Sequence, residues 1–117
     1  MSGNSNYDKR SWFGDYGPSL SVVGPAGGGN LALVTTDRSD SDPSVTNGWE
    51  WGSYSFYSAE GTSFSCPLAA GLAALIISEH ADWSGLAVRR QIESTCDRID
   101  AEAFPYDVKG KSASYGF

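Results

Sequence analysis

This 117-residue sequence contains only two cysteines, one histidine and eight basic side chains, so it has few residues of three kinds that often build functional sites. Cys66 and Cys96 are too few for a disulfide scaffold, and we expect both to be small buried residues on facing helix sides. Fourteen acidic residues give a net charge of −6, which argues against nucleic acid or an anionic membrane as a partner. The longest apolar run, residues 67–77, is too short to span a bilayer.

Residues 1–10 are polar and lack the apolar segment of a secretory signal, so the sequence leaves the localisation open. A hydrophobic fraction of 40%, with 13% aromatics, predicts one packed globular unit rather than disorder. The patterning predicts strands at 20–23, 31–36 and 51–58, and helices at about 63–79 and 84–97. We expect the last two strands to pair antiparallel, and 27–29 to form a turn rather than a phosphate loop.

The two predicted helices differ in their apolar pattern. The first is apolar on every face, which predicts a buried helix, and its Gly71 suggests a close packing contact. The second starts with Ser84 as N-cap. Its expected apolar stripe is Val88, Ile92, Cys96 and Ile99, with Arg89, Arg90 and Glu93 largely outside.

The most informative stretch is Gly61-Thr62-Ser63-Phe64-Ser65-Cys66-Pro67, which precedes the first helix. Gly61 allows a bend where a side chain would clash, and Pro67 is tolerated in a first helical turn. A serine at a helix start lies beside free backbone N–H groups, which can stabilise an oxyanion. The segment alone leaves Ser63 ambiguous, because an isolated Gly-Thr-Ser is more often a turn with an N-cap than a nucleophile.

This stretch resembles the nucleophile segment of the subtilisin-like serine proteases, Gly-Thr-Ser-x-Ala-x-Pro-x-x-x-Gly. Gly61, Thr62, Ser63, Pro67 and Gly71 are in register, and Ser65 replaces the usual Ala. Residues 11–27 and 110–117 resemble two further segments of that family, in family order. The resemblance implies an α/β chain, the C-terminal fragment of a three-layer fold. Short strands and a hairpin would precede the buried helix and a second, amphipathic helix.

The resemblance also implies a serine endopeptidase that cleaves peptide or protein substrates through an acyl-enzyme on Ser63. The backbone N–H of Ser63 would be one oxyanion donor, Thr62 would support that oxyanion hole, and Phe64 would lie near the leaving group. The family's Asp-Thr/Ser-Gly and His-Gly-Thr motifs do not occur in this sequence, and its oxyanion asparagine belongs upstream. We therefore expect residues 1–117 to be part of a peptidase domain, cut at both ends and inactive alone.

Other sources of a general base have little support. In a continuous helix Ser63 and His80 would be roughly 25 Å apart, so His80 cannot serve as the base within one chain. None of Lys9, Lys109 and Lys111 lies in an apolar setting that would activate it. The α/β-hydrolase elbow is excluded because Ser65 occupies the place of its second glycine. A non-catalytic binding or interaction module that retains part of the fold is the alternative function.

No cofactor is expected for the chemistry, although full-length members of this family often bind calcium. The acidic loop Asp37, Asp40 and Asp42 does not match an EF-hand and is expected to be solvated. The aromatic residues Trp49, Trp51, Tyr54, Phe56 and Tyr57 are expected to form a strand packing face, with a substrate groove as the alternative. Neither nucleic acid nor a membrane is an expected partner. An exposed apolar surface could lead to self-association.

Overall fold

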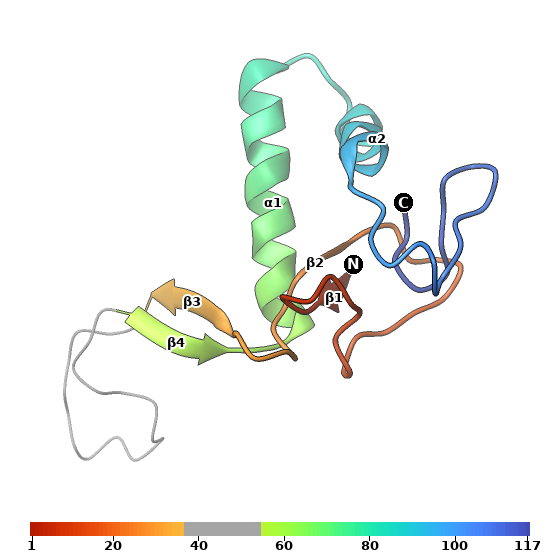
Figure 1. The fold of residues 1–117 in the computed structure, drawn as a ribbon. Coiled ribbons are helices and arrows are strands. Elements are labelled where there is room, and N and C mark those ends of the chain that lie inside the picture. The colour runs from red at the N-terminus through yellow and green to blue at the C-terminus, as the bar shows by residue number, and fades with distance from the viewer. Residues whose placement is uncertain (37–54) are drawn as a thin grey trace.

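The computed structural model describes residues 1–36 and 55–117, with the backbone alone over 55–58. In chain order the elements are β1 (Ser2–Asn4), β2 (Val23–Pro25), β3 (Leu33–Thr36), β4 (Ser55–Ala59), α1 (Thr62–Glu79) and α2 (Gly85–Thr95). The N-terminal end of α1, its base, packs on the β1–β2 pair, and α2 lies beside the C-terminal half of α1 (Figure 1). In the same figure the β3–β4 hairpin projects to one side. The arrangement is mixed α/β, as the sequence predicted.

The β1–β2 pair is the part of the fold that sequence patterning missed. Residues 1–10 were expected to be a polar lead-in, but β1 pairs in parallel with β2 and sets Gly3 opposite Gly24. A side chain on Gly3 would overlap the methyl group of Ala26, so the close approach requires glycine. Backbone hydrogen bonds rather than an apolar pattern hold this pair, which explains why periodicity did not reveal it.

The second strand also differs from its predicted position. The apolar residues Leu20 and Val22 are buried, but β2 begins only at Val23 and continues through Pro25. The hairpin is confirmed, because β3 and β4 pair antiparallel with Thr36 opposite Ser55. Residues 51–54 of the predicted strand lie outside the described part of the chain.

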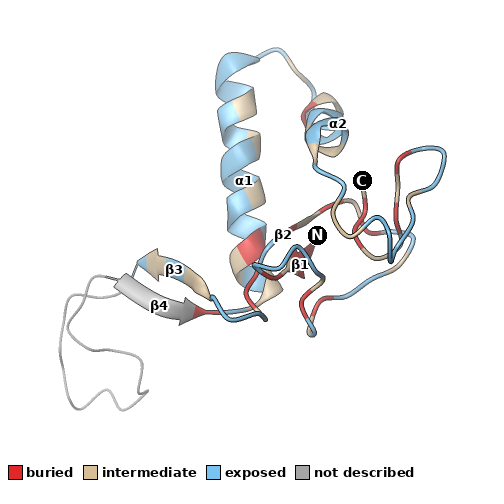
Figure 2. Ribbon diagram, in the orientation of Figure 1, coloured by how far each residue is buried: buried red, intermediate tan, exposed pale blue. Residues whose placement is uncertain are grey.

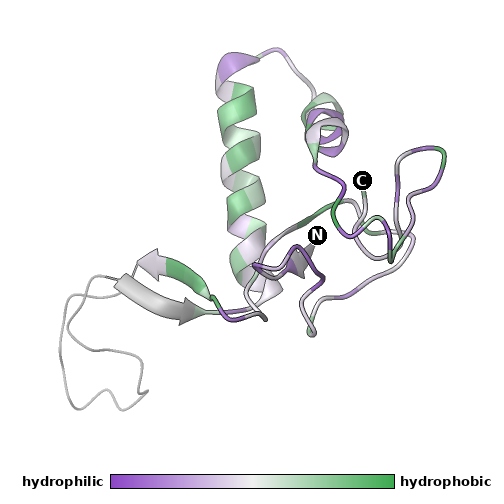
Figure 3. Cartoon of the chain, viewed as in Figure 1, coloured by the Kyte–Doolittle hydropathy of each residue, from purple (hydrophilic) through white to green (hydrophobic). Residues whose placement is uncertain are grey.

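Helix α1 begins within one residue of its predicted start, but the prediction that it is buried is wrong for this chain. Ser65 is its only buried residue, whereas most of its hydrophobic length is exposed (Figures 2 and 3). The exposed large side chains of α1 are Leu68, Leu72, Leu75 and Ile77. The described elements cover only the base of α1 and the side that faces α2. Nothing described covers the rest.

Two finer expectations about α1 fail for the same reason. A methyl group added at Gly71 would meet no described atom within 4 Å, so this glycine makes no close packing contact here. Cys66 is exposed, and Cys96 is half-buried at the end of α2 rather than facing it as a buried partner. Both expectations assumed a layer over α1 that the described residues do not supply.

By length and composition alone, α1 is also long and apolar enough to cross a membrane. An 18-residue window has a mean hydropathy of 1.4, and 6% of it is buried. The apolar run 67–77 is shorter than a span, and it is the whole helix, including its polar ends, that passes this test. The core helix of a water-soluble domain passes the same test, so the absence of a membrane partner stays a prediction.

Helix α2 starts as predicted, because the Ser84 hydroxyl accepts a hydrogen bond from the Ala87 N–H at 3.3 Å. Val88 is buried, but Glu93 does not lie outside as expected: its side chain is only 13% exposed. Glu93 accepts hydrogen bonds from the Ser21 hydroxyl and from Arg89 Nε. A helical wheel could not show this contact, because Ser21 lies 72 residues earlier in the chain.

The C-terminal residues 100–117 are irregular, as predicted, but they are closely tied to the N-terminal half. The Tyr115 ring is buried, and its hydroxyl accepts from the Arg10 N–H and donates to Asp100 Oδ2 at 2.8 Å. The Phe117 N–H donates to the Ser21 carbonyl. Two of the three segments that resemble the protease family therefore lie in contact.

The exposed apolar face of α1 leads to a prediction about association. Each large apolar side chain left in water forgoes roughly 1.5–3 kcal/mol, so we expect the chain to self-associate or to melt at low temperature. The double variant Leu72→Glu, Leu75→Glu should shift the light-scattering mass toward the monomer. Leu86→Glu on α2 is the control, because Leu86 is equally exposed but lies off this face. A monodisperse wild-type monomer with a sharp, high-temperature transition contradicts the prediction.

Glu93 leads to a prediction about pH. Partial burial raises the pKa of its carboxyl, but hydrogen bonds from Ser21 and Arg89 and the charges of Arg89 and Lys111 outweigh this, and the net pKa is lowered. A lowered pKa stabilises the fold above the ordinary value, and the stabilisation is lost as the pH falls below about 4.5. Thermal melts from about pH 7 to pH 3 should therefore show a smaller acid-induced loss in Glu93→Gln. The exposed Glu102→Gln serves as control, and equal pH dependence of all three proteins contradicts the prediction.

Candidate active site

The candidate site is built on a sharp bend between β4 and α1. Gly61 has a φ angle of 134° and a ψ angle of 154°, a conformation that side chains with a Cβ rarely adopt. It is the N-cap of α1, and its carbonyl accepts from the Phe64 N–H at 3.0 Å. The bend ends the strand and starts the helix within two residues, which places Ser63 in the first helical turn.

Ser63 is exposed and is the second residue of α1. In an α-helix the N–H groups of the first residues have no intrahelical acceptor, and Gly61 has no side chain to cap them. The backbone N–H groups of Thr62 and Ser63 therefore lie beside the Ser63 hydroxyl, at the positive end of the helix dipole. This arrangement suits an anion that forms next to the hydroxyl.

Two details of the motif differ from expectation. Thr62 does not cap the helix with its hydroxyl, because Gly61 is the N-cap and α1 has no side-chain cap hydrogen bond. Pro67 lies in the second turn of α1 rather than the first. Without an N–H, Pro67 cannot donate to the Ser63 carbonyl, which is its i−4 partner. The helix nevertheless starts at Thr62 and does not extend back into β4.

Residues 25–28 hold this turn through hydrogen bonds, a role that the sequence analysis did not predict. The Pro25 carbonyl accepts from the Ser65 hydroxyl at 2.6 Å, and the Ala26 carbonyl accepts from the Gly61 N–H at 2.8 Å. The Gly28 N–H donates to Glu60 Oε1 at 3.1 Å. Two features of the sequence could have indicated this role: the serine in place of the usual alanine at position 65, and the glycine-rich run 27–29.

The same segment is fixed from its other side. The Ser11 hydroxyl donates to the Gly27 carbonyl at 2.6 Å, and the Ala26 N–H donates to the Asn4 carbonyl at 2.9 Å. Gly27 has a φ angle of 81°, and a side chain there would overlap Glu60. The sequence predicted a flexible turn at the glycine run, but these contacts hold it in place, and the start of α1 is held against it.

His80 is not placed to act on Ser63. It is the C-cap of α1, its N–H donates to the Ile76 carbonyl, and its ring stacks on Trp83 at 4.0 Å. Since α1 is continuous, roughly 25 Å separates its two ends. His80 is the only histidine of the sequence, so residues 1–117 provide no imidazole base for Ser63.

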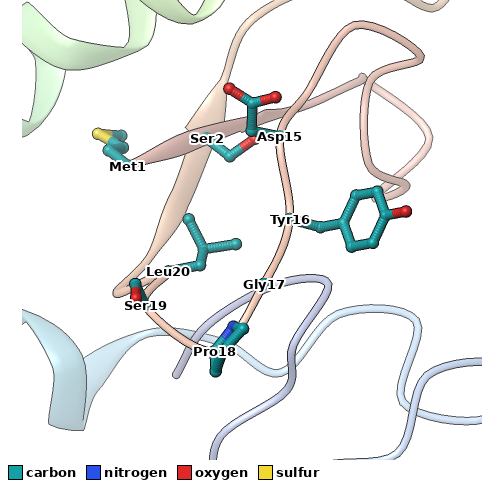
Figure 4. A pocket seen from close by; sticks show the side chains of 8 residues that line it. All are labelled: Met1, Ser2, Asp15, Tyr16, Gly17, Pro18, Ser19 and Leu20. Carbon is teal, nitrogen blue, oxygen red and sulfur yellow. The ribbon is translucent and has the colours of Figure 1, made fainter.

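Of two hollows among the described residues, neither is lined by Ser63. One, of about 450 Å³, lies between α1, α2 and residues 21–22, and its lining is mostly apolar, including Ala73, Ile77 and Ile92. The other, of about 340 Å³, lies between β1 and residues 15–20 (Figure 4). There the Ser2 hydroxyl is buried and has no hydrogen-bond partner among the described residues.

A metal site is not formed by the part of the chain that the structure describes. No group of three His, Cys, Asp or Glu side chains gathers there. The acidic loop Asp37, Asp40 and Asp42 lies outside the described residues. So do the side chains of the aromatic cluster Trp49, Trp51, Tyr54, Phe56 and Tyr57. The described residues therefore gather no set of acidic side chains for calcium.

Comparison with known proteins gives a family match over almost the whole chain. A family model described as the subtilase family matches residues 2–117. The chain is 35% identical to the calcium-dependent protease of Nostoc sp. over 121 residues, which is 97% of this chain and 18% of that protein. The protein of the same name from Trichormus variabilis is 33% identical with equal coverage.

A shorter match is to the subtilisin-like protease SBT1.5 of Arabidopsis thaliana, 42% identical over 45 residues, which is 38% of this chain and 6% of that protein. No solved structure matches the chain. The chain thus spans less than a fifth of the two calcium-dependent proteases. The family match over residues 2–117, the three ordered segments and the mixed α/β arrangement agree, and the chain belongs to the subtilase family.

Proposed function

We propose that this chain is the nucleophile-bearing part of a serine endopeptidase, with Ser63 as the nucleophile. The observation that carries the proposal is an exposed hydroxyl in the first turn of α1, beside N–H groups without intrahelical acceptors. The names of the relatives, which are proteases, support it. The substrate class is a peptide or protein, with a preference for apolar or extended segments.

In this mechanism the Ser63 hydroxyl attacks the carbonyl carbon of the scissile peptide while a base takes its proton. The Ser63 N–H donates a hydrogen bond to the oxyanion, with Thr62 supporting the hole, and the amine leaves with a proton from the same base. Phe64 lies on the leaving-group side. Water then hydrolyses the acyl-enzyme.

The base and its orienting carboxylate are proposed to come from the remaining part of a subtilase domain. His80 is at the wrong end of α1, so residues 1–117 alone are inactive. Calcium, which the names of the relatives suggest, is proposed only for a complete domain. It enters no step of the chemistry at Ser63.

We predict that the isolated chain neither hydrolyses peptides nor reacts with a fluorophosphonate probe. The physical reason is the missing base, since an unactivated serine is a poor nucleophile. The pure chain is incubated with probe beside Ser63→Ala. Labelling of the wild type that disappears in Ser63→Ala contradicts the claim that the chain alone is inactive.

The nucleophile assignment needs a complete domain for its own test. Residues 1–117 replace the aligned segment in the Nostoc protease, and this chimera is compared with its Ser63→Ala and Ser78→Ala variants. Ser78 is a matched control, because its hydroxyl donates within the same helix to the Leu75 carbonyl, far from the bend. We expect probe labelling in the chimera and in Ser78→Ala but not in Ser63→Ala. Labelling that survives Ser63→Ala contradicts the nucleophile assignment.

The second candidate function is a non-catalytic interaction module. The observation that favours it is the uncovered apolar face of α1, which includes Leu68 and Leu75. The chimera separates the two functions. A folded chimera that does not react with the probe supports the interaction module.

A further inference from the structure

Ser63 lies midway between two residues that are anchored to the same strand end. Gly61, two residues before it, donates its N–H to the Ala26 carbonyl. Ser65, two residues after it, donates its hydroxyl to the Pro25 carbonyl at 2.6 Å. The two acceptors are consecutive in the chain. The backbone of the helical turn that contains Ser63 is therefore fixed on both sides.

The Ser65 side chain is buried, whereas the rest of α1 is not. Ser65 has no exposed surface and is the one buried residue of α1, whose other described side chains are exposed or half-exposed. Its acceptor, the carbonyl of Pro25, belongs to an exposed residue, so the hydrogen bond is part-buried and joins the base of α1 to the surface end of β2. Its loss would leave the Pro25 carbonyl without this donor.

We propose that the Ser65 hydroxyl is a positioning contact for the nucleophile, which sets the orientation of the Ser63 turn on residues 25–28. This inference rests on the proposed function of Ser63. Ser65 touches neither substrate nor reacting atoms. It acts through the first turn of α1, whose tilt fixes both the Ser63 hydroxyl and the Ser63 N–H.

The family segment usually has Ala at this position, so an active subtilase does not require the hydroxyl. In this chain β1 and β2 pack on the base of α1, and the Ser65 bond adds a directional contact to that packing. The second anchor therefore stabilises the turn from within, next to the nucleophile.

Glu60 extends the same anchor by one residue. Its Oε1 atom accepts from the Gly28 N–H at 3.1 Å, immediately before the Gly61 bend. Gln at position 60 keeps an acceptor oxygen in that place, whereas Ala removes it. The pair Glu60→Gln and Glu60→Ala thus tests the anchor without changing Ser65.

The first experiment uses the 117-residue chain and needs no catalysis. Hydrogen–deuterium exchange of the peptide that covers residues 59–66 reports on the Gly61 N–H, which is protected by the Ala26 carbonyl. Losing this part-buried hydrogen bond should speed this exchange about 2- to 10-fold in Ser65→Ala, with Glu60→Ala changing it in the same direction. Ser65→Thr, which keeps the donor, Glu60→Gln and the control Ser78→Ala should exchange as the wild type.

Melting curves of each variant show whether the fold is retained. Unchanged exchange in both Ser65→Ala and Glu60→Ala overturns the proposal. So does faster exchange that occurs equally across the whole chain, because this would show general destabilisation rather than loss of an anchor.

The second experiment measures kcat and KM in the Nostoc chimera. A misoriented nucleophile lowers kcat by about 3- to 30-fold and leaves KM unchanged, since substrate binding does not involve Ser65. Ser65→Thr should restore kcat. A rise in KM at constant kcat, or unchanged kinetics in Ser65→Ala, overturns the positioning role. If the unmutated chimera is inactive, the proposed function fails, and the exchange experiment decides the anchor by itself.

Discussion

The hydrogen bonds at the C-terminal end of β2 are the interaction on which the described structure depends. The polar groups of residues 25–28 connect β1, the loop at Ser11, and the start of α1. The most completely buried residues, such as Ala26 and Ser65, lie at the same place. Because each of these groups bonds to a different segment, this small polar network takes the place of a large apolar core.

The opposite end of the molecule shows what the network does not provide. Helix α1 exposes an apolar surface over most of its length, and β1–β2 is a parallel pair of only two short strands. Parallel sheets are normally larger and covered on both faces. Both features leave apolar surface that the described residues do not cover, and the chain spans less than a fifth of the two calcium-dependent proteases to which it is similar. The expected contacts of Gly71 and Cys66 are absent because the described residues place no layer over that surface of α1.

Local signals in the sequence predicted the elements that local chemistry determines. Ser84 caps α2, Gly61 ends β4, and the hairpin follows from two β-rich segments around a polar loop. The pattern could not predict β1, because three small polar residues carry no periodicity and pair only through distant backbone groups. The prediction that Glu93 lies outside was wrong for a related reason, because its partner Ser21 is remote in sequence.

The candidate site likewise has one part that the sequence predicts and one part that it does not. The bend and the helix start beside Ser63 could be predicted from the motif, because both are coded within a few residues. The anchors on residues 25–28 depend on tertiary contacts that span up to 40 residues, and no spacing rule reveals them.

This division has a consequence for catalysis. Under the proposed function, the orientation of Ser63 is fixed by bonds within the chain, and the base comes from another part of the domain. Pre-orienting the nucleophile lowers the entropy that must be lost when the base is brought to it. A polar anchor suits this task better than apolar packing would. Its direction is fixed by hydrogen-bond geometry, and it holds the turn although the described residues leave most of the apolar surface of α1 uncovered.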